Sequence, residues 1–158
     1  MEELLEYRQR LINKFTEAGL QLENAVSRIR DPFQPLEKDG WNLHQIAIHM
    51  RDVNQEVYLP RLDRIMLEEN PVFENFDGEA WMNVHYDPQE SLQKVVREFK
   101  EQCCSRAAWL LDLPIEAWNR LGSHPILGRH SLQWWVERTL AHISEHDAQL
   151  NSTREAEK

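Results

Sequence analysis

The sequence predicts an all-α protein folded as a four-helix bundle, and three observations support this prediction. Apolar residues recur at three- and four-residue steps along four long stretches, which is typical of amphipathic helices. The two-residue alternation of β-strands extends over no useful length. Only 5 of the 158 residues are glycine and 41% are apolar, as in ordered globular proteins. We expect one domain spanning residues 1–158, because a chain of this length removes roughly 70% of its unfolded surface from water.

The first two helices are predicted from their apolar stripes and from the residues at their ends. The first covers residues 2–29 and ends before a proline-containing loop. The second begins after Asn42, a favourable N-cap, with Gln45 at the capping-box position. It continues to about Leu67, and Pro60 is expected either to kink or to interrupt it.

A long connection follows the second helix. Residues 69–87 show no persistent period, and at roughly 3.3 Å per residue they are long enough to run the length of a bundle as an overhand crossover. The third helix is predicted to start at Asp87 as N-cap, with Pro88 at its first position and Glu90 completing a capping box, and to end near Leu111.

The fourth helix is predicted from Ser131 to Leu150. An irregular connection precedes it, with one helical turn around residues 116–118. Residues 151–158 are polar and are expected to form a frayed tail.

Charge and cysteine content restrict the partners and the compartment. The 27 acidic and 18 basic residues give a net charge of −9, which disfavours nucleic acid. No signal peptide or membrane-spanning apolar run is present, so we expect a cytoplasmic protein without a membrane partner. Cys103 and Cys104 cannot form an ordinary disulfide with each other, which fits a reducing compartment. We expect both to be small buried packing residues, with a reactive thiol as the alternative.

Three histidines form the candidate site. His142 and His146 are one helical turn apart on one face, and His49 lies in the second helix. In helical projection each borders an apolar stripe, so the rings converge if the second and fourth helices are neighbours. Three neutral imidazoles that leave coordination positions open are typical of a catalytic metal site, with Asp52 and Glu145 as candidate partners for the other ring nitrogens. Ordinary hydrogen bonding of the histidines is the alternative.

Two segments resemble the DinB-like superfamily of bacterial four-helix metalloproteins. Residues 41–52, WNLHQIAIHMRD, followed by Tyr58 and Arg61, are similar to its Trp-x-x-x-x-(Ile/Leu)-x-x-His-x-x-Asp and Tyr-x-x-Arg pattern. Residues 128–132, GRHSL, and 142–150, HISEHDAQL, are similar to its closing pattern of Gly, a hydroxyl residue and Leu, then His-x-x-x-His and Gln-Leu.

The resemblance implies a fold, a metal site and a range of activities. It implies an up-down-down-up bundle with the long connection between helices 2 and 3, and a homodimer. It assigns the ligands of a divalent ion, zinc or nickel, to His49, His142 and His146. The superfamily includes thiol S-transferases and a thiol-dependent isomerase. Extra histidines depart from its pattern, namely His44, His85, His124 and His130.

Our first hypothesis is a metal-dependent enzyme of small molecules, a hydrolase or a thiol S-transferase that uses a low-molecular-weight thiol. Glu56 is the candidate proton acceptor, with a solvated surface acid as the alternative. Arg61 is the candidate clamp for a substrate carboxylate, and a surface ion pair with Asp63 or Glu68 is the alternative. Trp135 either walls the pocket or belongs to the core.

Two further hypotheses stay open. In the first, the protein is a non-catalytic dimeric helical module that binds metal or is linked to stress. In the second, it is a degenerate family member whose site takes no ion.

Overall fold

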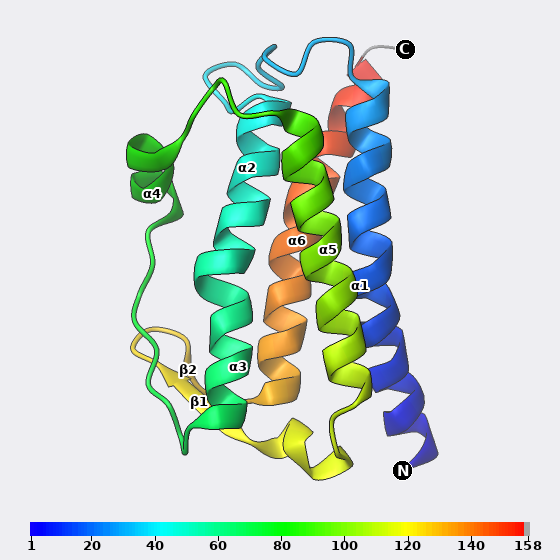
Figure 1. Ribbon diagram of the computed structural model, residues 1–158, viewed down its shortest axis with the longest axis vertical. Helices are drawn as coiled ribbons and strands as arrows, with labels where there is room; N and C mark the ends of the chain where they lie inside the picture. Colours follow the sequence, from blue (N-terminus) through cyan, green and yellow to red (C-terminus); the bar gives the residue numbers. More distant parts are fainter. Residues whose placement is uncertain (157–158) are drawn as a thin grey trace.

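Four helical rods pack side by side in the computed structural model, which describes residues 1–156 (Figure 1). The second rod is assembled from three consecutive helical segments. In chain order the elements are α1 (Glu2–Arg28), α2 (Leu43–Val53), the π-helical turn η1 (Asn54–Tyr58), α3 (Leu59–Leu67), α4 (Gly78–His85), α5 (Leu92–Leu111), the 3-10 turn η2 (Ile115–Asn119), β1 (Leu121–His124), β2 (Gly128–Ser131) and α6 (Leu132–Ala156).

The topology is up-down-down-up, as predicted. In Figure 1, α1 runs up, α2 to α3 and α5 both run down, and α6 runs up. The connection between α3 and α5 returns along the outside of the bundle and carries α4. Helix α1 packs against α5 and α6, α2 packs against α5, and α3 packs against α6. This arrangement makes the second rod and α6 neighbours.

The core fills the space between the rods with large apolar side chains. The largest fully buried ones are Trp135, Phe15, Phe73, Phe99, Leu22, Leu43, Ile46, Ile48, Met50, Leu62, Ile65 and Leu110. Trp135 is 1% exposed and donates its indole N–H to the Gly122 carbonyl at 3.1 Å, so it belongs to the core. No helix in the described part of the chain is both long and apolar enough to cross a membrane.

The second rod passes Pro60 without a break because of the π-helical turn η1. The Leu59 N–H bonds to the carbonyl of Asn54, five residues earlier, a pattern that fits one extra residue into the turn. Pro60 then lies in the first turn of α3, where a missing N–H is tolerated. The expected kink or interruption is therefore a π-turn in a continuous rod.

The crossover contains a helix that the sequence did not indicate. Asp77 caps α4 by accepting hydrogen bonds from the N–H groups of Glu79 (3.1 Å) and Ala80 (3.0 Å). Met82 is the only residue of α4 that is buried. A helix with one buried residue has no apolar stripe, so periodicity could not reveal it.

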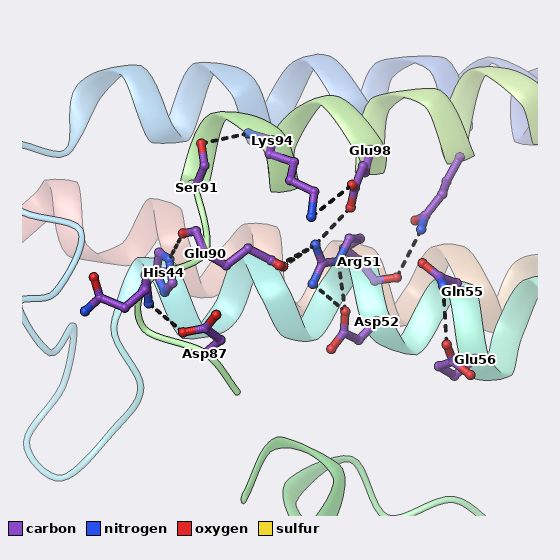
Figure 2. A network of polar contacts seen from close by, with 12 residues as sticks. His44, Arg51, Asp52, Gln55, Glu56, Asp87, Glu90, Ser91, Lys94 and Glu98 are labelled. Atoms are coloured by element: carbon purple, nitrogen blue, oxygen red, sulfur yellow. Dashed lines mark hydrogen bonds and ion pairs between the residues drawn. The ribbon is translucent and has the colours of Figure 1, made fainter. Parts of the chain in front are cut away.

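The third rod begins later than predicted. Ser91, whose hydroxyl accepts from the Lys94 N–H at 3.3 Å, caps α5 in place of Asp87. The Glu90 carbonyl oxygen is 2.7 Å from His44 Nε2, and its carboxylate accepts from Arg51 Nη1 at 3.0 Å (Figure 2). These tertiary contacts hold the preceding turn outside the helix, which a capping pattern alone cannot reveal.

Arg51 is the centre of the polar network that joins the second rod to α5 (Figure 2). Its guanidinium donates to Asp52 (2.8 Å) and Glu98 (2.9 Å) as well as to Glu90. Because the Arg51 side chain is only 10% exposed, these bonds are largely shielded from water.

Between η2 and α6 the chain forms a short hairpin where we expected an irregular connection. Strands β1 and β2 pair antiparallel, from Leu121 opposite Ser131 to His124 opposite Gly128. Each strand has only four residues, and the residue types in LGSH and GRHS do not alternate between apolar and polar, so periodicity did not predict the strands. The predicted helical turn around residues 116–118 is confirmed by η2.

The last helix starts where predicted but ends later. The Ser131 hydroxyl accepts from the Trp134 N–H at 3.3 Å and caps α6. The helix continues to Ala156, six residues beyond the expected end at Leu150. The last two residues of the expected tail, 157 and 158, lie outside the described residues.

Replacing Arg51 with alanine should lower the free energy of unfolding by about 2–4 kcal/mol, because Asp52 and Glu90 lose their shared cationic partner in a shielded place. Urea denaturation measures the change. Arg97→Ala, which removes an exposed arginine of α5, is the matched control and should change stability by less than about 0.5 kcal/mol. Equal stability of the two variants would contradict the prediction.

Candidate metal centre

His49 of α2 and the pair His142 and His146 of α6 meet at one point. The Nε2 atom of His142 is 3.2 Å from that of His49 and 3.1 Å from that of His146. The candidate ligand atoms of the three rings all lie within 4.8 Å of one another. The predicted convergence is confirmed, and it follows from the contact between the second rod and α6.

The three rings are suited to bind a cation. Burial lowers the pKa of His49 to about 4 and that of His142 to about 3, and it also lowers the pKa of His146, so the rings are neutral near pH 7. Two nitrogens bound tetrahedrally to one zinc ion are about 3.3 Å apart, close to the spacing found here. Three neutral rings whose Nε2 atoms converge fit a divalent ion.

The outer ring nitrogens do not have the partners that we expected. Asp52 accepts from Arg51 and, at 3.1 Å, from the indole N–H of Trp81, and it makes no hydrogen bond to His49. Within the described residues the Nδ1 atoms of His49 and His142 have no hydrogen-bond partner. The prediction of Asp52 and Glu145 as outer partners is therefore wrong, because Asp52 serves the Arg51 network and Glu145 is exposed. Gln149 is instead the outer partner of one ring, that of His146.

Gln149 is the partner of the third ring. Its Oε1 atom lies 3.1 Å from His146 Nδ1, and the hydrogen bond favours the charged form of His146 against burial. Accepting from Nδ1–H leaves the Nε2 lone pair of His146 facing the other two rings. The spacing of three residues along α6 could have indicated this contact.

Packing, rather than a hydrogen bond at Nδ1, orients the outer side of the His49 ring. The Trp41 ring lies 4.9 Å from the His49 ring, centre to centre. Gly78, at the start of α4, lies so close to this ring that a Cβ atom at Gly78 would be 2.8 Å from His49 Cε1. The bond from Trp81 to Asp52 holds α4 in this position. The crossover thus forms part of the wall of the histidine site.

A cavity of about 240 Å³ adjoins His49 and His142. Its wall includes Tyr58, Arg61 and Arg138. The Tyr58 ring lies 5.0 Å from the His142 ring, and burial raises the pKa of its hydroxyl. The cavity therefore adjoins the candidate metal site, and its wall carries the protonated Tyr58 hydroxyl and the two guanidinium groups.

The π-turn explains how Tyr58 and Arg61 reach this cavity. On an unbroken α-helix these residues would lie about 180° and about 120° around the axis from His49. One extra residue in the turn rotates the following residues back by about 100°, toward the face of His49. Arg61 donates to the Glu74 carbonyl at 3.0 Å and is buried.

The alternative prediction, that Arg61 forms a surface ion pair with Asp63 or Glu68, is wrong. Asp63 pairs with Arg106 and Glu68 pairs with Arg64, each through hydrogen bonds of 2.6 Å. Arg61 therefore has neither of the carboxylate partners that we considered for it.

The structure does not bring Glu56 to the histidines. Its carboxylate is exposed, accepts from the Gln55 side chain at 3.4 Å and is absent from the cavity wall. The π-turn invalidates the helical count that placed it near His49.

Of the two cysteines, Cys103 is buried, and burial raises its pKa to about 12, whereas Cys104 is exposed against our expectation.

Sequence reasoning missed Arg138 and His124. Arg138 is one helical turn before His142 and so shares its face of α6, a signal that the spacing contained. His124, at the end of β1, reaches the cavity through a hairpin that the sequence did not reveal. The other extra histidines are not in the cavity wall: His44 bonds Tyr86 at 2.8 Å, His85 stacks on Trp81 and His130 stacks on Trp134.

Acid should destabilise the metal-free protein through these rings. Their folded-state pKa values of about 4 and about 3 lie below the ordinary 6.5 of the unfolded chain, so the unfolded chain binds protons first. The stability they contribute is complete above pH 6.5 and is lost as the pH falls toward 4 and 3, on the order of 1–3 kcal/mol per ring. Urea denaturation from pH 7 to pH 4 should show a smaller loss for His142→Gln than for the unmodified protein. Identical losses would exclude the effect.

Gly78→Ala tests the contact between α4 and the site. The new methyl group would meet His49 Cε1 at 2.8 Å, so the ring or α4 must shift. We expect a loss of about 1–3 kcal/mol in the free energy of unfolding, as for other overpacked contacts. Glu79→Ala, at the neighbouring exposed position of α4, is the control and should change stability little. If the two variants were equally stable, the close approach would have no cost.

Comparison with known proteins places the chain among bacterial relatives. A protein of Oceanobacillus iheyensis named "Putative metal-dependent hydrolase" is 30% identical over 115 residues, which cover 66% of this chain and 64% of that protein. The matched region thus spans slightly less than two thirds of the relative.

The fold is shared with a solved structure. It is YfiT from Bacillus subtilis, described as "a probable metal-dependent hydrolase with an unusual four-helix bundle topology". The two structures superpose with a TM-score of 0.86 over 96% of this chain and 87% of that chain, at 21% identity. The family model of the DinB superfamily matches residues 2–150. This match covers almost every element described above, including all three histidines, and the chain therefore belongs to the DinB superfamily.

Proposed function

We propose that this protein is a divalent-metal-dependent enzyme of small molecules, with His49, His142 and His146 as the metal ligands. The convergence of three neutral imidazoles beside a cavity, with His142 Nε2 at 3.2 Å from that of His49 and at 3.1 Å from that of His146, is the observation that carries the proposal. A structural zinc site has four protein ligands, whereas three leave room for water or substrate. The names of the two relatives support the same assignment.

The residues around the ion would bind and orient the substrate. The ion, when bound, supplies Lewis acidity that lowers the pKa of water or of a thiol. Tyr58 keeps its proton because burial raises its pKa, so it acts as a hydrogen-bond donor. Arg61 and Arg138 offer positive charge in the same cavity. Val53, Val57 and Phe76 form an apolar part of the cavity wall.

Hydrolysis is the reaction that the relatives' names favour. Thiol S-transfer, which the resemblance implies, is the second candidate. Neither Cys103 nor Cys104 lines the cavity, so a thiol reacting there has to be a small molecule from solution. The choice of zinc or nickel, the homodimer and the cytoplasmic location stay predictions.

Elemental analysis tests the metal site. Protein purified without a histidine tag and loaded with zinc or nickel should hold about one ion per chain. His142→Gln should reduce the ion content at least about tenfold, because the amide side chain is a poor ligand of these ions. His85→Gln, a change of an exposed histidine outside the site, should leave the content unchanged. Equal ion content in both variants would refute the assignment of the ligands.

Activity assays separate an enzyme from a non-catalytic metal-binding module. We expect the loaded protein to hydrolyse small esters or amides, or to join a low-molecular-weight thiol to an electrophile. His142→Gln should lower kcat/KM by at least about 100-fold, whereas His85→Gln should not. If the protein binds its ion but catalyses neither reaction, the non-catalytic module stands. If it takes up no ion at all, it is a degenerate member of the family.

A further inference from the structure

The cavity beside the histidines has an unusual charge for this protein. The chain carries a net charge of −9, yet among the described residues no Asp or Glu lines the cavity. Arg61 and Arg138 both do. Two guanidinium groups in one cavity of an acidic protein make this cavity a local site of attraction for anions.

Neither guanidinium is neutralised by a carboxylate in the described part of the chain. Arg61 is 8% exposed, and its hydrogen bond goes to the uncharged Glu74 carbonyl. The Nε atom of Arg138 is buried and has no hydrogen-bond partner. Arg61 also lies 5.6 to 5.8 Å from the centres of the Tyr58, Phe73 and Trp135 rings. Because buried charges are normally paired with an opposite charge, the buried Arg61 and the half-buried Arg138 favour an anionic ligand in this cavity.

The two arginines also act on each other. Burial lowers the pKa of Arg61, and the like charge of Arg138 lowers it further. The two side chains are therefore close enough to repel. A negatively charged group between them would remove this repulsion and form charge-assisted hydrogen bonds with both.

His124 and Tyr58 add uncharged donors to the wall. The Nδ1 atom of His124 accepts hydrogen bonds from the N–H groups of Ile126 and Leu127, both at 3.1 Å. Two donors on Nδ1 fix the proton of the neutral ring on Nε2. Burial keeps the Tyr58 hydroxyl protonated. The polar groups that line the cavity are thus mainly donors, as an oxyanion requires.

We propose that the substrate of this site is a small oxyanion, a carboxylate or a phosphate, whose charged group lies between Arg61 and Arg138. The inference rests on the proposed function for the reaction itself, since the neighbouring histidines would hold the ion. A cavity volume of about 240 Å³ suits a small ligand. Arg138 is the new specificity residue, because it faces the cavity from the same helix as two of the histidines.

Isothermal titration calorimetry with succinate, inorganic phosphate and the neutral analogue succinamide tests this inference. Each probe is titrated into full-length protein, both metal-free and zinc-loaded. We expect succinate or phosphate to bind and succinamide not to bind. The tighter of the two anions identifies the ligand as a carboxylate or a phosphate.

Variants of Arg138 establish where the anion binds. Arg138→Gln should weaken binding about 10- to 100-fold, because one charge-assisted contact is lost. Arg138→Lys should retain part of the affinity as a point charge. Arg97→Gln removes the same charge from an exposed position on α5 and should not alter binding. Circular dichroism of each variant verifies the fold.

The outcomes separate this inference from the metal proposal. Anion binding that depends on Arg138 supports the inference even if elemental analysis finds no ion. Zinc binding without any anion binding, or anion binding that Arg138→Gln leaves unchanged, overturns the inference and leaves the metal proposal in place.

Discussion

One extra residue in the helical turn of residues 54–58 determines which side chains share a cavity with the histidines. The π-turn changes the phase of the second rod just before Pro60, so that Tyr58 and Arg61 face the same side as His49. Without it, the rod would present these two side chains elsewhere. Such turns are frequently found at functional sites, and here the turn joins a cation-binding face to a donor-lined wall.

Residues distant from the histidines help to position the histidine rings. Arg51 ties the second rod to α5, and Asp52, one of its partners, also accepts from Trp81 of α4. Through Trp81 the crossover is placed so that Gly78 contacts the His49 ring. The histidine of the second rod is thus positioned by packing from α4, whereas His146 is positioned by a hydrogen bond within α6.

The sequence predicted the parts of this protein that depend on local periodicity. The four rods and the convergence of His49 with His142 and His146 follow from apolar stripes and from residues that border them. The family resemblance supplied the topology. The start of α5 was misplaced because Glu90 is held by His44 and Arg51, contacts between segments more than 35 residues apart.

Other features left no periodic signal. Helix α4 buries one residue and the hairpin strands have four residues each, so neither shows an apolar pattern. The role proposed for Glu56 assumed an unbroken α-helix, and the π-turn removed that assumption. Glu145 was a poor choice as an outer partner because it directly precedes His146 and points about 100° away from it, whereas Gln149, three residues further on, shares the face of His146.

Helix α4 buries little of its surface in the core, and this bears on how ligands reach and leave the site. This helix covers one side of the His49 ring but anchors only Met82 in the core. Detaching it would expose little apolar surface, so such an opening requires far less free energy than unfolding the bundle. The segment that contacts the imidazole is thus the one whose displacement would leave the four rods assembled.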